Sequence, residues 1–169
     1  NDDALGSPHW IFNYISWNGN LSQFWNNAGN WDTGYIPTQY DRVLIPNSAS
    51  NHCNLTGATT IRGLTIESNR ILITAGNNLT ISGTFSNDGT LRITDTEVMT
   101  FTNDSNSGTV EYVGATDANL DFTDFYNLNI TGTAQFTATG TTYINGNFTM
   151  SNGTFNATGR TIQVGGNWN

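Results

Sequence analysis

The last third of the chain repeats itself at an interval of about twenty residues. Residues 138–148 (ATGTTYINGNF) return, with small changes, as residues 157–168 (ATGRTIQVGGNW). The interval is 19 residues at the first alanine and 20 at the closing aromatic residue. A fixed interval of this length, filled with short apolar triplets and turns rich in Gly and Asn, is typical of a solenoid.

Short triplets recur from residue 43 onward, and most alternate apolar and polar residues. This alternation predicts very short strands with one buried face. The triplets are Val43–Ile45, Leu64–Ile66, Ile71–Ile73, Leu79–Ile81, Leu91–Ile93, Val110–Tyr112, Leu120–Phe122, Leu128–Ile130, Phe148–Met150 and Ile162–Val164. Stretches of Gly, Asn and Asp between them supply tight corners. No window has a 3.6-residue period, so we expect almost no helix.

Equivalent apolar positions are one interval apart, which favours a β-solenoid over an antiparallel sandwich. Leu128, Phe148 and Trp168 are spaced 20 residues apart, as are Ile144 and Val164. In a solenoid such residues stack about 4.8 Å apart. We therefore predict an all-β fold, a parallel β-solenoid (β-helix) of about six coils of 19–20 residues. The rod would be on the order of 30 Å long.

The N-terminal segment, residues 1–42, differs from the rest in composition and predicts a cap. It contains four of the five tryptophans, Trp10, Trp17, Trp25 and Trp31. The first coil of a solenoid exposes unpaired backbone groups and an open apolar end, which bulky aromatic side chains can cover.

The spacing of Leu44 and Leu64, also 20 residues, places the first coil near residue 43. We therefore divide the chain into a Trp-rich capping and assembly segment, 1–42, and a β-solenoid, 43–169. Residues 95–125 keep the period less well, and we expect a loop or bulge there.

A distinctive string, FWNNAGNWDTGYIP at residues 24–37, is followed by DRVLIP at residues 41–46. It resembles a segment that heads β-solenoid regions in large secreted surface proteins of bacteria and archaea, which are similar to filamentous-haemagglutinin-type adhesins. The strings at residues 79–91 and 125–130 resemble the same group. The resemblance implies a β-helix with a Trp-rich capping segment and an extracellular, cell-surface location, and it implies no enzymatic activity.

The charge of the chain excludes several partners. A net charge of −8, with five arginines and no lysine, argues against a surface that follows nucleic-acid phosphates. No apolar run approaches the roughly 18 residues needed to cross a bilayer, so we expect no membrane insertion. The single cysteine, Cys53, excludes an internal disulfide, and we interpret it as a buried apolar residue, with an intermolecular bridge or a free thiol as alternatives.

The densest acidic group, Asp117, Asp121 and Asp124, is the strongest candidate for chemistry. Its oxygens are weak candidates for calcium ligands, and two of its carboxylates could flank a glycosidic bond. The spacing matches no calcium loop and no arginine is near in sequence, which favours turn residues. His9 and His52 lack the neighbouring ligands of a zinc site. We assign no catalytic residue and no cofactor, and we expect that the protein is not an enzyme.

Eight Asn-x-Ser/Thr sequons occur in the chain. Where the middle residue is apolar and faces the core, strand alternation turns the Asn and the Thr outward, within reach of a glycosylating enzyme. For an archaeal or eukaryotic source, we predict glycosylation at Asn54, Asn78, Asn129, Asn147, Asn152 and Asn156.

The sequence given closes with Gly165–Asn169, within a coil and without a second aromatic cap. An uncovered coil is a template for another chain, so either the polypeptide continues or the next subunit supplies the cover. A head-to-tail contact that does not close builds a filament. We therefore expect an extracellular structural protein that binds copies of itself head to tail, in a filament or cell-surface layer. The residues assigned to self-association are Trp10, Trp17, Trp25, Trp31, Val164 and Trp168.

Two other classes of function stay open. Flat aromatic rings stack on pyranose faces, so the N-terminal tryptophans also fit a carbohydrate-binding or adhesin module whose partners are surface glycans. A polysaccharide-cleaving β-helix enzyme is the third class, and it would depend on Asp121 and Asp124.

Overall fold

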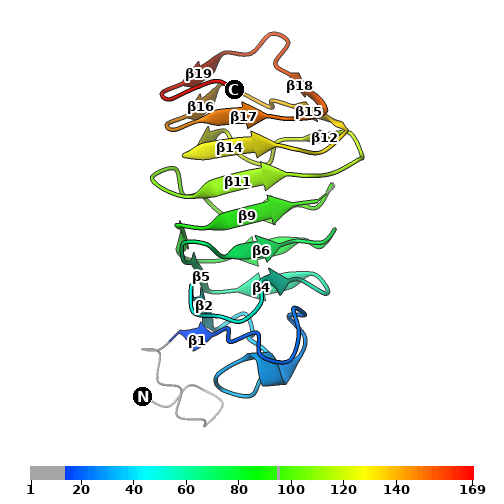
Figure 1. Ribbon diagram of the computed structural model, residues 1–169. Helices are drawn as coiled ribbons and strands as arrows, with labels where there is room; N and C mark the ends of the chain where they lie inside the picture. The colour runs from blue at the N-terminus through cyan, green and yellow to red at the C-terminus, as the bar shows by residue number, and fades with distance from the viewer. Residues whose placement is uncertain (1–13, 95) are drawn as a thin grey trace.

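The computed structural model of the protein describes residues 14–94 and 96–169. Its described residues form short strands and one 3₁₀ turn, stacked along a single axis from β1 at one end to β19 at the other (Figure 1). The elements are β1 (Ile15–Ser16), η1 (Ala28–Asn30), β2 (Arg42–Ile45), β3 (Cys53–Asn54), β4 (Thr59–Ile61), β5 (Gly63–Ile66), β6 (Ile71–Ile73), β7 (Leu79–Ile81), β8 (Phe85–Asn87), β9 (Thr90–Ile93), β10 (Met99–Thr100), β11 (Thr109–Tyr112), β12 (Ala118–Asn119), β13 (Asp124–Phe125), β14 (Asn127–Ile130), β15 (Gln135–Thr137), β16 (Thr142–Ile144), β17 (Phe148–Met150), β18 (Thr154–Asn156) and β19 (Ile162–Val164).

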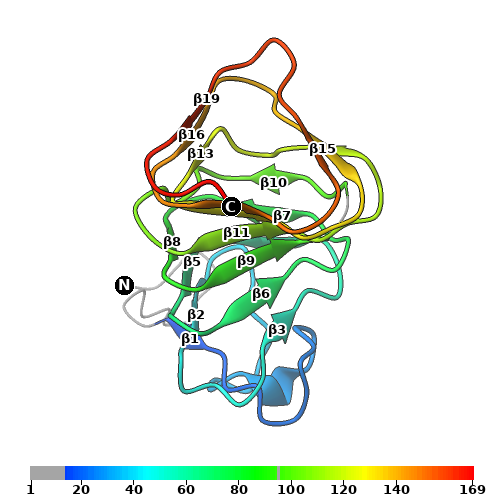
Figure 2. The same cartoon turned by 45° about the horizontal axis from the view of Figure 1, so that its top comes forward.

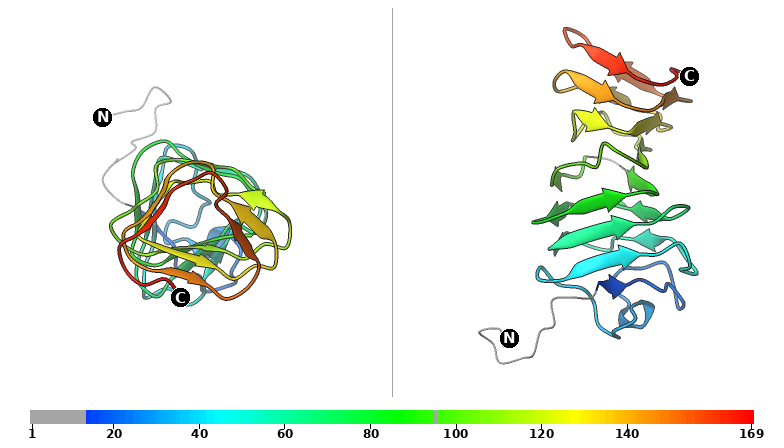
Figure 3. Two further views of the ribbon diagram at one scale, coloured as in Figure 1. Left: turned by 90° about the horizontal axis from the view of Figure 1, so that it is seen from above. Right: turned by 90° about the vertical axis from the view of Figure 1, so that its left-hand side faces the viewer.

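Strands one coil apart pair in parallel, which confirms the predicted parallel β-solenoid of about six coils. Seen along the axis, the coils have a roughly triangular outline (Figure 3). One side, which we call the long face, is a continuous sheet of six strands in the order β3-β6-β9-β11-β14-β17. Figure 2 shows several of these strands side by side.

The other two sides each consist of two shorter sheets. One side has β1-β2-β5-β8 and then β13-β16-β19, and the other has β4-β7-β10 and then β12-β15-β18. On the first side, residues 101–108 form no strand between β8 and β13, and on the second, β10 does not pair with β12, the strand one coil further on. We call residues 101–108 the break, and it lies within the predicted loop or bulge at residues 95–125.

The core is a set of columns in which like residues stack from coil to coil. On the long face, Leu72 lies next to Leu91, and Leu128 next to Phe148, in register. Phe148 continues the column to Trp168, as the 20-residue spacing predicted. The side chains of the first four residues are fully buried, and the column continues through Val110. Because each coil covers the apolar surface of the one before it, burial provides the main stabilisation of the rod.

The first coil begins earlier than the sequence predicted. Ile15 of β1 pairs with Val43 of β2, so the stack extends below residue 43. The spacing of Leu44 and Leu64 was also misleading, because Leu44 pairs with Thr65 and Val43 pairs with Leu64. The first full coil is therefore one residue longer than the interval of the C-terminal repeat.

Polar side chains also align between coils. Asn147 N donates to Asn127 Oδ1 at 2.9 Å, and Asn167 N donates to Asn147 Oδ1 at 2.9 Å. Asn127 Nδ2 extends this column by donating to the carbonyl of Gly108 at 2.9 Å. We call this column the asparagine ladder. It satisfies backbone N–H groups at a corner where the chain leaves the strand geometry.

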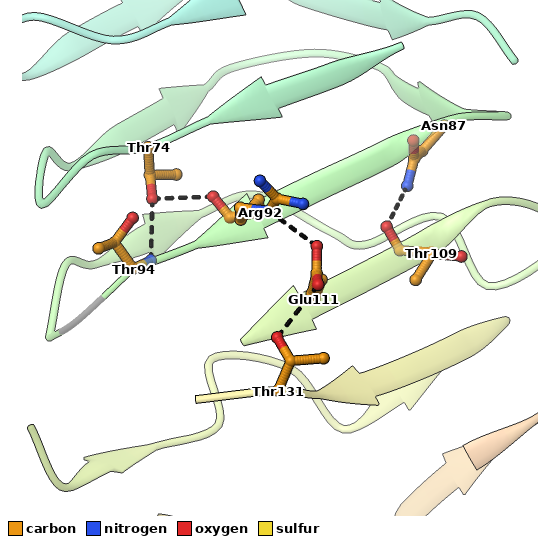
Figure 4. Close-up of polar contacts among 7 residues, drawn as sticks. All are labelled: Thr74, Asn87, Arg92, Thr94, Thr109, Glu111 and Thr131. Atoms are coloured by element: carbon orange, nitrogen blue, oxygen red, sulfur yellow. Dashed lines mark hydrogen bonds and ion pairs between the residues drawn. The ribbon is translucent and has the colours of Figure 1, made fainter. Parts of the chain in front are cut away.

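On the outer side of the long face, side chains link neighbouring coils (Figure 4). Arg92 Nε lies 2.8 Å from Glu111 Oε2, and Thr131 Oγ1 donates to Glu111 Oε1 at 3.1 Å. A further link comes from inside the rod, where the buried Asn87 of β8, on another side, donates through Nδ2 to the carbonyl of Thr109 at 3.1 Å (Figure 4). These side-chain contacts add to the backbone hydrogen bonds between the strands of the long face.

The segment before β2 closes the end of the rod and confirms the predicted aromatic cap. Trp31 meets Trp17 and Trp25 edge to face, with ring centroids 4.9 Å and 4.7 Å apart. Asn30 is fully buried among them, and its Oδ1 accepts hydrogen bonds from the N–H groups of Leu21 and Ser22. Trp25, Asn30 and Trp31 of the string at residues 24–37 therefore form the interior of the cap.

Candidate functional site

Three of the four cap tryptophans predicted for self-association are buried inside the molecule. Trp17, Trp25 and Trp31 are 0%, 4% and 2% exposed. Their indole rings fill the cap, and the Nε1 groups of Trp17 and Trp31 donate to the backbone carbonyls of Asn51 and Trp25. Trp10 lies outside the described residues. The three buried indoles can neither contact a second copy nor stack on a sugar, which corrects both predicted uses of these side chains.

Other apolar side chains of the cap are exposed, and the sequence analysis assigned them no role. They are Tyr14 (41% exposed), Leu21 (68%), Phe24 (49%), Tyr35 (44%), Ile36 (39%) and Tyr40 (62%). Partial desolvation, together with the nearby carboxylates of Asp41 and Asp32, raises the pKa of Tyr35 above its ordinary value. The sequence shows that these residues alternate with the tryptophans along the cap. It does not show which of them are buried, and only the fold separates the two sets.

At the opposite end, the last coil leaves apolar groups partly uncovered. Trp168 is 61% exposed and lies edge-on against Phe148, with ring centroids 4.9 Å apart. Val164 is half-buried above Ile144, and Phe155 is also half-buried. In the described residues β18 pairs only with β15 and β19 only with β16. Of the predicted self-association residues, Val164 and Trp168 are thus accessible.

The three aspartates predicted as weak calcium candidates accept hydrogen bonds from three different residues. Asp117 Oδ1 accepts from Gln135 N at 2.8 Å, whereas Asp121 Oδ1 accepts from Met99 N at 3.2 Å. Asp124 Oδ2 accepts from the Thr123 hydroxyl at 3.0 Å. No group of three His, Cys, Asp or Glu side chains suited to a metal ion occurs in residues 14–94 and 96–169. The geometry fits the turn interpretation of these aspartates.

Asp121 belongs to a partly buried polar group beside the break. The buried Tyr112 hydroxyl lies 3.3 Å from Asp121 Oδ2 and accepts from Asp121 N at 3.0 Å. Burial raises the pKa of Asp121, although hydrogen bonds from Met99 N and Tyr112 oppose the shift. Burial also raises the pKa of Tyr112 well above its ordinary value. The group joins β10, β11 and the chain before β13, and it has the character of a structural link.

The predicted glycosylation positions differ in accessibility. The middle residues Leu55, Leu79, Ile130 and Phe148 of four sequons are buried, as expected. The predicted asparagines that are exposed are Asn78, Asn147 and Asn152, and those that are half-exposed are Asn54, Asn129 and Asn156.

Asn54 differs from the other predicted glycosylation positions. Its Oδ1 is buried and accepts no hydrogen bond from a described residue. This side chain is therefore directed partly into the molecule, against the outward orientation that strand alternation predicted. Asn54 is the least suitable of the six positions for glycosylation.

Cys53 is fully buried on the long face, and burial raises the pKa of its thiol well above the ordinary value. In the described residues it is a free cysteine, next to Leu72 in the core column. Its position agrees with the interpretation of a small apolar core residue.

Comparison with protein families places the chain in one of them. Residues 16–143 match the model of the family described as a domain of unknown function, DUF8693. The chain belongs to this family. The matched region begins in β1 and ends in β16, so it includes the cap and the break. No curated protein and no solved structure matched the chain. Among the described residues there is no helix of the length and hydropathy needed to cross a membrane.

Proposed function

We propose that this protein is an extracellular structural protein that associates head to tail, through the two ends of the rod, into a filament or cell-surface layer. The observation that carries the proposal is the distribution of exposed apolar side chains. Of the ten large hydrophobic side chains exposed in the described residues, six lie in residues 14–40 and one is Trp168. The remaining three are Val98, Tyr126 and Tyr143.

The last coil also offers hydrogen-bonding groups to a neighbour. Within the described residues β18 and β19 are each paired on one side only. Backbone N–H and C=O groups on their other side can pair with a strand of a neighbouring copy. A second copy that brought its cap against this coil would pair some of these groups and cover Trp168, Phe155 and Val164. The cap would contribute Leu21 and Phe24, whose side chains are about half exposed or more.

The charge of the protein makes this contact dependent on salt. At a net charge of −8, two copies repel each other at long range. Salt screens this repulsion over about 10 Å at 0.1 M ionic strength, whereas it leaves apolar contacts intact. Head-to-tail association is therefore expected to strengthen as the salt concentration rises.

The test uses variants that disable one end at a time. Leu21→Ser/Phe24→Ser alters the cap, and Trp168→Ser alters the last coil. The matched control is Val98→Ser/Tyr143→Ser, which removes two exposed apolar side chains outside the cap and the last coil. Sedimentation velocity and electron microscopy are expected to show elongated oligomers for the wild type and the control, and monomers for each end variant.

An equimolar mixture of the two end variants distinguishes a head-to-tail contact from any other. Each variant keeps one intact end, so the mixture should form dimers and nothing longer. A wild type that stays monomeric at high protein concentration and high salt would contradict the proposal. So would end variants that assemble like the wild type.

A further inference from the structure

A groove runs along the side of the rod where the cap meets the first coils. It consists of two adjoining hollows of about 410 Å³ and 400 Å³ that share Thr60. The first is lined by Trp25, Asn26, Ile36, Pro37 and residues 56–60. The second is lined by Gln39, Tyr40, Thr60, Arg62 and Ser82. Both hollows are open to solvent, and their volumes fall within the range of small-ligand sites.

The stacking of coils explains why these residues meet. The N–H groups of Arg62 and Gly63 donate to the carbonyl of Asp41, at 2.9 Å and 3.4 Å. Ser82 N donates to the carbonyl of Ile61 at 3.0 Å. Residues 39–41, 61–63 and 82 therefore occupy the same corner on three successive levels, and the groove follows this corner.

The side chains of the second hollow combine an aromatic ring with hydrogen-bond donors. Tyr40 is 62% exposed, so its ring is available for stacking. The Arg62 side chain is exposed and forms no hydrogen bond or ion pair with a described residue. Thr60 and Ser82 add two exposed hydroxyl groups, and Gln39 adds an amide.

The charge of the groove indicates the kind of ligand. Thirteen acidic residues occur in the chain, yet no Asp or Glu of residues 14–94 and 96–169 lines either hollow. The acid adjacent in sequence, Asp41, is 5% exposed, and its Oδ2 accepts from the N–H and hydroxyl of Thr38. Arg62 is therefore a cation available to a ligand, and a guanidinium can bind a carboxylate through two parallel hydrogen bonds.

The geometry points to a binding site for an acidic carbohydrate, a pyranose that carries a carboxylate, such as a uronic-acid unit. The Tyr40 ring stacks on the apolar face of the sugar. Arg62 binds its carboxylate, and Gln39, Thr60 and Ser82 hydrogen-bond its hydroxyls. Ile36 and Tyr40, which line the groove, are also among the exposed side chains counted for the head-to-tail contact. The binding measurement below therefore uses a variant in which that contact is disabled, so that the two proposals can fail independently.

The probe is a trisaccharide of galacturonic acid, compared with its neutral counterpart, galactotriose. Binding is measured by isothermal titration calorimetry and by NMR on the monomeric Leu21→Ser/Phe24→Ser protein, which retains every residue of the second hollow. We expect Arg62→Gln to weaken binding of the acidic trisaccharide by about tenfold or more and to abolish the preference for it over the neutral one. Tyr40→Ala should weaken binding of both by about fivefold.

The matched controls are Arg160→Gln and Tyr143→Ala, an exposed arginine and an exposed tyrosine outside the groove. Both should bind like the parent, and the NMR spectrum of each variant reports whether it is folded. The proposal is overturned if the parent shows no binding at millimolar trisaccharide or binds both trisaccharides equally. It is also overturned if the controls weaken binding as much as the groove variants do.

Discussion

The long face and the other two faces of the rod meet the break at residues 101–108 in different ways. On the long face, β9, β11 and β14 pair without interruption, and Leu91, Val110 and Leu128 stay in register. On the other two faces the sheets end at β8 and β10, and new sheets begin at β13 and β12. The coils on the two sides of the break therefore share one continuous backbone ladder instead of three.

Side chains bridge the break where the backbone ladder is missing. Asp104 Oδ2 accepts from Asn87 N at 2.9 Å, and Asn103 Nδ2 donates to the carbonyl of Asp124 at 2.8 Å. Asn145 Nδ2 donates to the carbonyl of Ser105 at 2.9 Å from the other side. A buried backbone group without a partner is costly, so these polar residues maintain the stack across a change of sheet.

The comparison teaches that the two halves of the rod are coupled mainly through the long face. In a solenoid each coil contacts only its neighbours, and stability is a sum of coil and interface terms. The interface at the break has fewer ladder hydrogen bonds, so we expect it to be the weakest of the described stack. Three measurements test this difference.

The largest effect is expected from the core of the long face. Leu91 is fully buried between Leu72 and Val110, and Leu91→Ala should lower the free energy of unfolding by about 2–5 kcal/mol. Urea denaturation followed by circular dichroism measures this change. Val98→Ala, at a position that is 55% exposed, should change stability by less than about 0.5 kcal/mol. A loss at Leu91 as small as at Val98 would show that the long face does not carry the stack.

A smaller effect is expected at the break. Asp104→Ala removes a carboxylate that accepts from Asn87 N and from Asn106 N, and should cost about 1–3 kcal/mol. Hydrogen exchange should show faster exchange of the Asn87 amide, because that amide loses its acceptor. The control is Asp88→Ala, which removes an exposed carboxylate from the turn after β8. Unchanged protection of Asn87 in the Asp104 variant would contradict the bridging role.

The smallest effect is the pH dependence contributed by Asp121. Because burial raises its pKa above the ordinary value of 3.8, the folded protein binds this proton more tightly than the unfolded chain does. The stabilisation from protonation is present below pH 3.8 and is lost as the pH rises through the raised pKa.

In the wild type, the free energy of unfolding should fall as the pH rises above 3.8, and in Asp121→Asn this fall should be absent. The variant should be at least as stable as the wild type at neutral pH. Urea denaturation between pH 3 and pH 7 tests this, with Asp117→Asn as the exposed control. An unchanged pH profile in the Asp121 variant would show that the carboxyl is not perturbed by folding.

The stacking of like residues made the architecture predictable from sequence. Leu128, Phe148 and Trp168 occupy one column, and their spacing could be counted directly. The corner lengths could not be predicted, because a corner projects outward and can gain a residue without disturbing the core. The pairing of Val43 with Leu64, one residue off the interval of the C-terminal repeat, is the example.

The candidate sites were predictable in composition but not in orientation. The sequence indicated an aromatic cap, but it could not separate the buried Trp17 from the exposed Leu21, since the cap has no regular period. Likewise, the contact between Asp121 and Met99 joins residues on different coils. The groove that Arg62 lines is formed by residues from three successive coils at one corner. The sequence alone does not show that these residues meet.

The asparagine ladder has a consequence for how such a rod can change in evolution. The side chains of Asn127 and Asn147 each accept the same hydrogen bond, from the backbone N–H of the asparagine one coil further on, so these two levels present the same acceptor to the level that follows. Duplication or loss of one such sequence unit would lengthen or shorten the molecule by about 4.8 Å while its cross-section stays the same. Its reach can thus be adjusted in equal increments, without redesigning either end.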